Sequence, residues 1–162
     1  METKKLIIGA CGQIGSELTV RLKEIYGSAN VVAADIVKGK QAFVKEGPFE
    51  VVNALDFNQI QTVVEKHNVD EVYLMAALLS ATAEKNPAFA WDLNMGSLFH
   101  ILNLAKAGKI KRYFGPPALL FLVPPLPEKT PHNTPSWNLR LCMEYLNKQA
   151  NAGASITTPT TE

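Results

Sequence analysis

The sequence predicts a doubly wound α/β fold, in which the strands of a parallel sheet alternate with helices along the chain. Short aliphatic runs alternate with segments whose apolar residues recur at helical spacing, from residue 4 to residue 114. The first run is followed by Gly9, Gly12 and Gly15, at the spacing G-x-x-G-x-x-G. The second run ends at Asp35, which stands 20 positions after Gly15. Together these features indicate a sheet that binds a ligand at the carboxyl ends of its strands.

The first strand is expected over residues 4–8, and the glycine loop follows it directly. A chain that turns sharply from strand to helix needs glycine where a Cβ would block the turn, the approach of a pyrophosphate or close helix–strand packing. We expect the N–H groups of Gly12, Gln13 and Ile14 to begin the helix and to face phosphate groups. A glycine triplet also occurs in ordinary strand–helix turns, so the flanking strand and helix are what favour a dinucleotide site.

The helix that follows and the second strand lead to a candidate ribose ligand. Gly27 is the expected stop of this helix, and one buried face is predicted by Ile14, Leu18, Leu22 and Ile25. A strand over residues 31–34 then ends at Asp35. At that distance from the glycine loop a carboxylate can accept hydrogen bonds from both adenosine ribose hydroxyls, and its charge would repel a 2′-phosphate. The prediction is therefore NAD rather than NADP, the alternative being an aspartate that only caps a turn.

The next segment continues the alternation. Residues 37–47 are expected to form a loop or short helix, residues 49–55 a third strand, and residues 69–75 a fourth strand. Asp56 stands at the carboxyl end of the third strand and can cap a helix over residues 57–67. We interpret His67 as a structural residue at the end of that helix. After the fourth strand, Ala76 and Ala77 are small enough to let a cofactor lie across the strand ends.

The last predicted helix and strand lie between residues 86 and 114. Asn86 followed by Pro87 is a typical helix start, and Gly108 is the expected end. One stripe of this helix is predicted from Phe89, Leu93, Ser97, Ile101 and Leu104. Residues 111–114 are the expected opening of a fifth strand. Ligands should then bind at the carboxyl ends of the first and fourth strands, where the chain order reverses.

Composition excludes several other classes of protein. The chain has 162 residues, which suits one domain, and its net charge of +1 gives no electrostatic case for nucleic acid or acidic membranes. The two cysteines, Cys11 and Cys142, indicate a reducing compartment without a disulfide framework, and we interpret Cys11 as a packing residue. The apolar run 118–123 is too short to span a bilayer. We therefore expect a soluble, cytoplasmic protein without a metal site.

Residues 4–114 resemble the extended short-chain dehydrogenase/reductase superfamily, also called the NAD-dependent epimerase/dehydratase superfamily. The matching pieces are GACGQIG, the pairs Asp35-Ile36, Leu55-Asp56 and Ala76-Ala77, and Asn94 within DLNMGSL. Within the superfamily, the run LLSATAEKNPAFAWDLNMGSLFHILNLAKAGKIK resembles the short-chain type of L-threonine 3-dehydrogenase. One departure is Leu74, where these proteins usually have histidine.

The resemblance implies a Rossmann-like fold, NAD as cofactor and a small amino acid as the substrate of the intact enzyme. It implies cofactor contacts by Gly9, Gly12, Gln13, Ile14, Gly15, Asp35, Ile36, Leu55, Asp56, Ala76, Ala77 and Asn94, and a substrate contact by Ser80. It also implies a mechanism, in which a tyrosine whose pKa is lowered by a nearby lysine removes the hydroxyl proton of L-threonine. Hydride then passes to NAD, and 2-amino-3-ketobutyrate forms.

The resemblance stops after Phe114. The family motifs Pro-Ser-Ser and Tyr-x-x-x-Lys are missing from these 162 residues, and Tyr145 and Lys148 are only three positions apart. Eight of the ten prolines follow Phe114, and such a segment cannot support central strands or long helices. We expect an NAD(P)-binding Rossmann-like domain over residues 1–114, which is only part of the family domain, and a Pro-rich, disordered tail over residues 115–162.

A shift of reading frame would explain this tail. With suitable codons, residues 142–148 read in another frame as Tyr-Gly-Ile-Ser-Lys-Gln, which contains the missing motif. One base restored before residue 115 yields Trp-Pro-Ser-Ser in the same frame. The codons of Met143 and Trp137 allow no choice, and one frame fits both ends. The alternative is a genuinely divergent tail.

These observations predict a truncated, inactive relative of L-threonine 3-dehydrogenase that retains its NAD-binding half. Two alternatives remain open: a non-catalytic dinucleotide-binding or regulatory module, and a nucleotide-sugar epimerase or dehydratase of the same superfamily. The missing tyrosine and lysine argue against the second alternative. The expected partner is NAD, with no nucleic acid and no membrane, and the dimer typical of the family is not expected of this chain.

Overall fold

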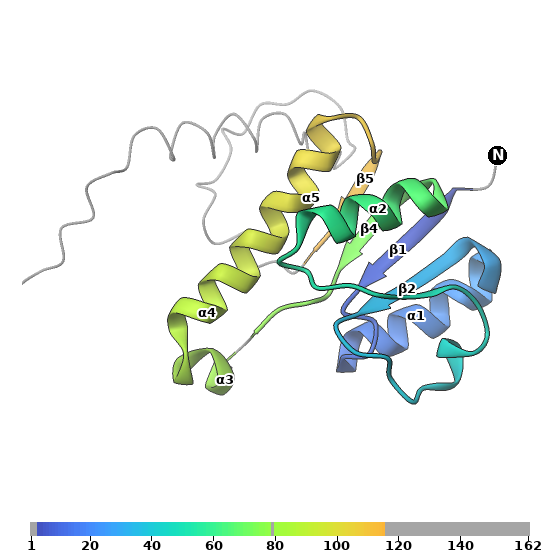
Figure 1. The fold of residues 1–162 in the computed structure, drawn as a ribbon. Helices are drawn as coiled ribbons and strands as arrows, with labels where there is room; N and C mark the ends of the chain where they lie inside the picture. Colours follow the sequence, from blue (N-terminus) through green and yellow to red (C-terminus); the bar gives the residue numbers. More distant parts are fainter. Residues whose placement is uncertain (1–2, 79, 116–162) are drawn as a thin grey trace, which may run out of the picture. The chain divides into compact units, whose positions relative to one another are not determined.

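The computed structural model describes residues 3–78 and 80–115, and in this part of the chain a five-stranded parallel sheet forms the centre (Figure 1). The strands are β1 (Lys4–Ile8), β2 (Val31–Asp35), β3 (Phe49–Val51), β4 (Val69–Leu74) and β5 (Arg112–Phe114). Their order in the sheet is β3-β2-β1-β4-β5, and every neighbouring pair is parallel. The predicted doubly wound, Rossmann-like fold class is therefore confirmed.

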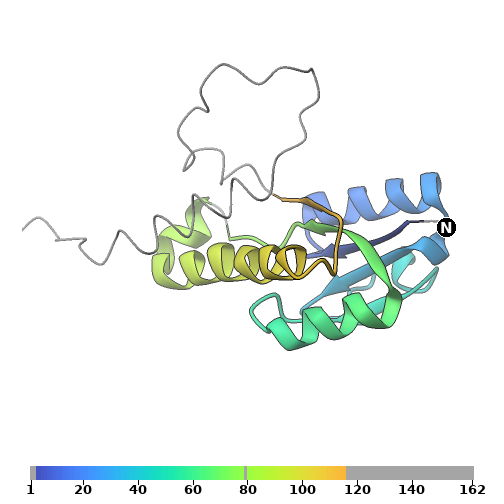
Figure 2. The ribbon, with the colours of Figure 1, turned by 90° about the horizontal axis from the view of Figure 1, so that it is seen from above.

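Helices cover both faces of the sheet. Figure 2 shows α1 on one face and α2 and α5 on the other. The α-helices are α1 (Gln13–Tyr26), α2 (Phe57–His67), α3 (Ser80–Lys85), α4 (Pro87–Trp91) and α5 (Ser97–Lys106). A π-helical turn, Asp92–Gly96, connects α4 to α5, and the loops contain 3₁₀ turns at Ser28–Asn30 and Ala42–Val44.

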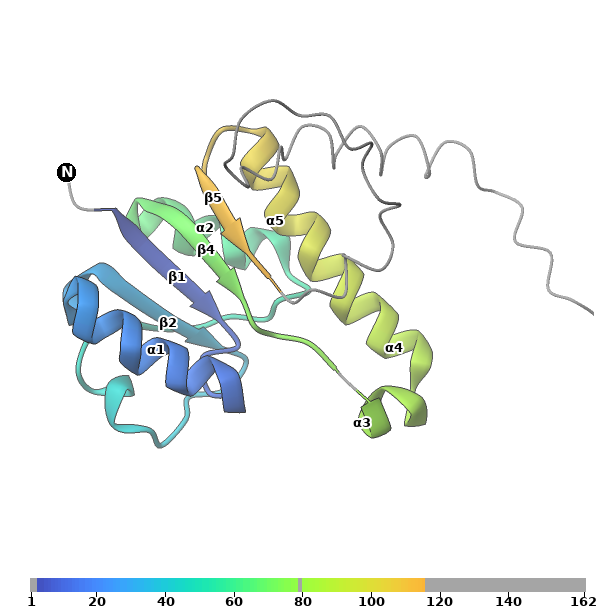
Figure 3. The same cartoon turned by 180° about the vertical axis from the view of Figure 1, so that it is seen from behind.

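The chain order reverses between β1 and β4, as Figure 3 shows from behind. Ile8, the last residue of β1, is in register with Ala34 of β2 and with Leu74 of β4. The carboxyl ends of these three strands therefore meet at one edge of the sheet. This edge, formed by the segments that follow β1, β2 and β4, is called the carboxyl edge below.

The central strands are buried on both faces, because helices cover each side. Leu6, Ile7 and Ile8 of β1 are at most 1 % exposed, and the apolar residues of β2 are fully buried. Strands in this position are expected to be continuous apolar runs rather than alternating ones. That is the pattern from which the sequence predicted them.

Two predicted elements differ in detail from the structure. The third strand ends at Val51 rather than at residue 55, because β2 ends at Asp35 and offers no further partner. In α1, Ile14 and Ile25 are 67 % and 55 % exposed, although the apolar spacing placed both on the buried face. The buried face is instead formed by Gly15, Thr19, Leu22 and Lys23. The buried position of Gly15 sets this face, and Ile14 lies about 100° away on the helix.

The structure also bears on the predicted start and buried stripe of the last helix. Asn86 caps α4 through a hydrogen bond from the N–H of Phe89, as predicted. Phe89 itself is 46 % exposed, so it does not lie on the buried stripe on which the apolar spacing placed it. Apart from Gly115, the predicted tail lies outside the described residues, as do Tyr145 and Lys148.

Among the residues that the structure describes, no helix has the length and apolar character needed to cross a membrane.

Candidate dinucleotide-binding site

Two of the three glycines in the loop are required by the protein itself. Gly9 has φ +87°, and a Cβ on it would lie 2.5 Å from the backbone nitrogen of Ala76. A Cβ on Gly15 would lie 2.0 Å from the carbonyl oxygen of Gly9. Both distances are far below van der Waals contact. Gly9 therefore lets the loop after β4 approach, and Gly15 lets α1 pack against the turn.

Gly12 is different, because nothing in the described protein requires glycine there. Its φ is −70°, and a Cβ would meet only the carbonyl oxygen of Gly9, at 3.4 Å. Gly12, Gln13 and Ile14 are all exposed at the start of α1. The space that a side chain would fill at Gly12 is thus open toward solvent. This open space beside the backbone of Gly12 fits a ligand that approaches the backbone closely.

The start of α1 also has the electrostatics of an anion site. Gly12 is the N-cap of this 14-residue helix, it provides no side-chain hydrogen bond, and the first turn contains no acidic residue. The first N–H groups of a helix have no partner inside the helix, and the helix dipole places partial positive charge there. A pyrophosphate fits these groups in both charge and hydrogen bonding.

Asp35 binds the glycine loop to the end of β2. Its Oδ2 accepts a hydrogen bond from the N–H of Cys11 at 2.8 Å, and its Oδ1 accepts one from the N–H of Ile36 at 2.8 Å. The turn-capping role that the sequence allowed is therefore present. A carboxylate has about four acceptor positions, so each oxygen keeps one for a ribose hydroxyl. The two roles of Asp35 are compatible.

Gln41 contacts the glycine loop near this end, and sequence reasoning missed this contact. Its Nε2 donates to the carbonyl oxygen of Cys11 at 3.1 Å, while its Oε1 is buried and has no hydrogen-bond partner in the described structure. No motif could have revealed it, because it lies in a loop without periodicity. Cys11 packs against the core beside it. Burial raises the pKa of the Cys11 thiol, and the charge of Asp35 adds to this despite an opposing hydrogen bond with Gly39, which fits the predicted packing role.

Leu55 and Asp56 follow β3 and lead into α2. Asp56 is the N-cap of α2, as predicted: Oδ1 accepts from the N–H of Gln59 at 3.1 Å, and Oδ2 accepts from the Gln59 side chain at 2.9 Å. The N–H of Leu55 donates to Oδ1 of Asn53 at 3.0 Å. The two residues are therefore held in place, and their contact with a cofactor stays a prediction.

The loop after β4 crosses the end of β1. The N–H groups of Met75 and Ala76 both donate to the carbonyl oxygen of Ile8, at 2.7 and 2.9 Å. Further along, Leu78 pairs with Asn94: its N–H donates to Asn94 Oδ1, and Asn94 Nδ2 donates to its carbonyl oxygen, both at 2.9 Å. Ala76, Ala77 and Asn94 are thus brought to the same edge as the glycine loop. The side chain of Ser80 is outside the described structure, and its substrate contact stays a prediction.

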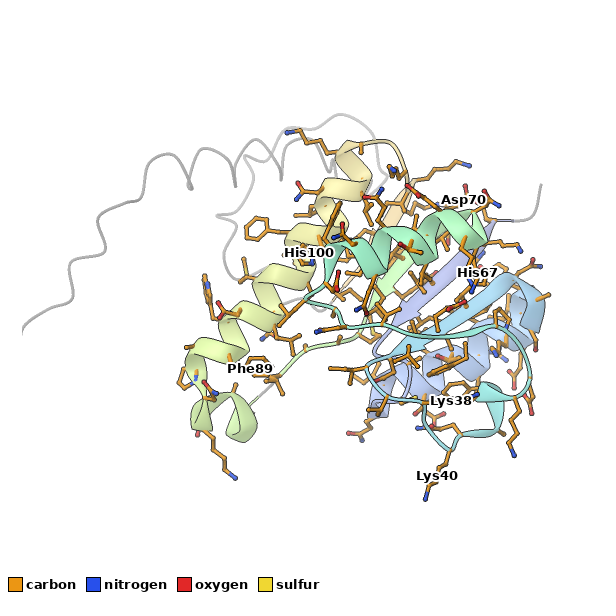
Figure 4. The ribbon with its side chains drawn as sticks, in the orientation of Figure 1. Lys38, Lys40, His67, Asp70, Phe89 and His100 are labelled. Carbon is orange, nitrogen blue, oxygen red and sulfur yellow. The ribbon has the colours of Figure 1, made fainter. Side chains whose placement is uncertain are left out.

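The histidines that the structure describes have structural contacts (Figure 4). His67 Nε2 lies 2.7 Å from Glu50 Oε1 and joins the end of α2 to β3, as expected of a structural histidine. His100 Nδ1 lies 3.2 Å from the carbonyl oxygen of Ala54, and its ring contacts Phe57 edge-on. In the described part of the chain, no group of three or more His, Cys, Asp or Glu could hold a metal ion.

Two tyrosines of the sheet are poorly suited to act as a base. Burial raises the pKa of Tyr73 to about 12, with a further contribution from Glu71, and burial raises that of Tyr113 to about 12. A catalytic phenolate needs a pKa shifted in the opposite direction. The described carboxyl edge therefore has the features of a cofactor site, without a general base from these two residues.

Comparison with known proteins places this geometry in a family. Residues 5–116 match the NAD dependent epimerase/dehydratase family. An uncharacterized epimerase/dehydratase of Staphylococcus saprophyticus is 44 % identical over 133 residues, which are 82 % of this chain and 40 % of that protein. The chain spans about two fifths of the length of the curated relatives it matches.

Solved structures of L-threonine dehydrogenases are similar over part of the chain. A partial consensus L-threonine 3-dehydrogenase is 51 % identical with a TM-score of 0.63, over 70 % of this chain and 35 % of that one. A GalE-like L-threonine dehydrogenase from Cupriavidus necator, in its holo form, is 48 % identical with a TM-score of 0.64, over 68 % of this chain and 36 % of that one. The match over residues 5–116, which carry the glycine loop, Asp35 and the loop after β4, shows that the chain belongs to the NAD-dependent epimerase/dehydratase family.

Proposed function

We propose that this chain binds NAD at the carboxyl edge, as the cofactor-binding half of a protein resembling L-threonine 3-dehydrogenase, and that the 162-residue chain does not itself oxidise L-threonine. The observation that carries the proposal is Gly12, where a Cβ would fit the protein but would fill the space in front of the first N–H groups of α1. A glycine that the fold does not need is explained by a ligand that approaches the backbone.

The positions of the predicted contacts set the direction of the cofactor. The pyrophosphate lies against the N–H groups of Gln13 and Ile14, where the helix dipole favours an anion. The N–H of Gly12 already donates to the carbonyl oxygen of Gly9 at 3.2 Å, so Gly12 contributes open space rather than a donor. The adenosine ribose lies on Asp35, beside Ile36, which is 61 % exposed at this edge. The nicotinamide half then extends over β1 toward Ala76 and Ala77, because dinucleotides cross the sheet where the strand order reverses. The nicotinamide supplies the hydride acceptor of the family reaction.

The negative charge of Asp35 makes NAD the preferred dinucleotide. A 2′-phosphate on the adenosine ribose would lie against a carboxylate, whereas a 2′-hydroxyl can donate a hydrogen bond to it. The side chains that follow on the loop after β2, Lys38 and Lys40, are positively charged (Figure 4), so Asp35 is the group here that would repel a 2′-phosphate. Asp35 is therefore the residue that decides between the two cofactors.

Inactivity follows from the missing base. A positioned general base typically contributes about 10²–10⁴-fold to the rate. The chain contains no Tyr-x-x-x-Lys motif, and burial raises the pKa of Tyr73 and Tyr113, the two tyrosines in the described strands. L-threonine is favoured over a nucleotide sugar as the substrate class of the complete relatives, because the solved L-threonine dehydrogenases reach 48–51 % identity. A non-catalytic NAD-binding module is the related possibility, and it shares the same site.

Calorimetric titration with NAD tests the binding part. The wild-type chain should bind one NAD, whereas Gly12→Ala should lose at least tenfold in affinity and keep its fold by circular dichroism. Equal NAD affinity in wild type and Gly12→Ala would overturn the site assignment. NADH formation with millimolar L-threonine tests the activity part. Turnover that survives Tyr145→Phe would show that another base exists.

The frame-shift hypothesis for residues 115–162 needs the coding DNA, because residues 116–162 lie outside the described structure. The gene should lack one base near the codons of Phe114 and Gly115, and the alternative frame should stay open across residues 115–158. Stop codons within that frame would rule the hypothesis out. A chain with the base restored and the family sequence supplied downstream should recover L-threonine oxidation.

A further inference from the structure

The amide of Asn94 forms a two-point clamp on the backbone of Leu78. Oδ1 accepts from the N–H of Leu78 and Nδ2 donates to its carbonyl oxygen, both at 2.9 Å. The side chain thus satisfies the donor and the acceptor of one residue, as a neighbouring strand would. Residues 78 and 94 are 16 positions apart and belong to different elements. The clamp therefore fixes the loop after β4 to the helical segment that precedes α5.

A π-helical turn presents Asn94 to this loop. Asn94 lies in the middle of Asp92–Gly96, and Ser97 Oγ donates to the carbonyl oxygen of Leu93 at 2.6 Å within the same segment. A Cβ on Gly96 would lie 3.1 Å from the side chain of Leu55, so the turn also packs closely against the segment between β3 and α2. Inserted π turns are frequent at functional sites. This one lies between two predicted cofactor segments.

The clamped loop is the part of the edge that the nicotinamide half must cross. Met75 and Ala76 are fixed to Ile8, and Ala76 lies against Gly9. Beyond Ala76, the clamp on Leu78 is the next anchor that the structure describes. Because the adenosine ribose lies over β2 at Asp35, the opposite half of the dinucleotide reaches β4 and this loop.

We propose that Asn94 is a positioning residue, which sets the place of residues 76–78 through Leu78 and so determines binding of the nicotinamide ring of NAD. The inference rests on the proposed function and changes the role that the family resemblance implied, a direct contact of Asn94 with the cofactor. In this arrangement one acceptor position and one N–H of the amide are already used by Leu78. The adenosine half is held at Gly12 and Asp35 and does not depend on the clamp.

Paired titrations with NAD and ADP-ribose separate this role from a general structural one. ADP-ribose shares the adenosine, the pyrophosphate and a ribose with NAD but lacks nicotinamide. Asn94→Ala removes both hydrogen bonds, and Asn94→Asp keeps the acceptor for the Leu78 N–H while facing the Leu78 carbonyl with a second oxygen. Both variants should raise the Kd for NAD about tenfold, as expected for a loss near 1.4 kcal/mol. The Kd for ADP-ribose should change less than twofold.

The matched control is Asn103→Ala, because Asn103 is an exposed asparagine on α5 and should leave both affinities unchanged. An equal loss of NAD and ADP-ribose affinity in the near-isosteric Asn94→Asp would overturn the inference, and so would unchanged NAD affinity in either folded variant. Faster amide exchange at Leu78 in the variants is the expected spectroscopic sign. If the folded wild-type chain binds neither ligand, the proposed function itself fails, which is distinguishable from failure of the clamp.

Discussion

The two ends of the candidate site are built by the same device on different supports. At the adenosine end, Asp35 at the end of β2 accepts the N–H of Cys11 and holds the glycine loop. At the opposite end, Asn94 in a π-helical turn holds the backbone of Leu78 after β4. In each case a polar side chain from another element fixes a loop that the proposed dinucleotide would approach. The supports differ: a strand end at one side and an irregular helical turn at the other.

This difference explains why one end could be predicted more fully than the other. The spacing from Gly15 to Asp35 follows from a strand–turn–helix–strand unit of regular geometry, so Gly15 and Asp35 could be placed near each other from the sequence, although the hydrogen bond from Cys11 could not. Asn94 could be named from the family resemblance, but its contact with Leu78 depends on a π turn. Regular 3.6-residue periodicity does not predict such a turn. The clamp therefore became visible only in three dimensions.

The largest effect at the two ends of the site should come from Gly15, whose lack of a Cβ lets α1 pack against the glycine loop. Gly15→Ala replaces glycine inside a helix, which ordinarily stabilises by roughly 0.5–1 kcal/mol. Here the new Cβ would lie 2.0 Å from the carbonyl oxygen of Gly9. We expect a loss of about 3 kcal/mol in the free energy of unfolding, measured by urea denaturation. Gly12→Ala is the matched control and should cost no more than about 1 kcal/mol, because alanine is a poorer N-cap than glycine but its Cβ meets no close backbone atom.

A smaller effect should distinguish the charge of Asp35 from its hydrogen bonds. Asp35→Asn keeps an acceptor oxygen near the Cys11 N–H but removes the negative charge. NAD affinity should fall roughly tenfold, as expected for a lost hydrogen bond to a charged group. NADP affinity should rise relative to NAD, because Lys38 and Lys40 are then the charges nearest in sequence. Titration of both cofactors measures the ratio, and an unchanged ratio would remove Asp35 as the discriminating residue.

The N-cap of α2, Asp56, follows Leu55 directly and lies away from the proposed pyrophosphate site. Its substitution therefore measures a contribution to stability alone. Asp56→Ala removes the hydrogen bonds from the backbone and side chain of Gln59. The free energy of unfolding should fall by about 1 kcal/mol. Asp56→Ser retains an acceptor and should recover part of the loss. An unchanged midpoint of denaturation in Asp56→Ala would show that the cap is energetically neutral.

The smallest of the expected effects concerns the ion pairs of Glu50 with Lys66 and His67, which acid should weaken. Burial alone would raise the pKa of this carboxyl, but hydrogen bonds from Lys66 and His67 outweigh it and hold the pKa below its usual value. A lowered pKa in the folded state stabilises the protein above the unfolded pKa, and this contribution disappears as pH falls through the folded pKa. Because Lys66 is exposed, we expect only about 0.5 kcal/mol. The stability difference between wild type and Glu50→Gln should shrink from pH 7 to pH 3.

Most of the fold could be predicted because its signals are local and regular. The buried strands were continuous apolar runs, and the caps at Asp56 and Asn86 were visible as residue types. Prediction failed where tertiary geometry decides. The end of β3 depends on where β2 stops, and the buried face of α1 depends on the close approach of Gly15 to Gly9. Gln41 contacts Cys11 from a loop, and no periodicity could indicate that contact.

The most direct test of the central claim is a two-dimensional ¹H–¹⁵N spectrum of the labelled chain titrated with NAD. If NAD binds at the carboxyl edge, shifts should appear at the amides of Gln13, Ile14 and Ile36 on one side of this edge and of Ala77 and Leu78 on the other. Amides near the amino ends of β1 and β4, such as those of Lys5 and Glu71, should stay in place. A folded spectrum that does not change at saturating NAD, or shifts confined to the amino ends of the strands, would contradict NAD binding at the carboxyl edge.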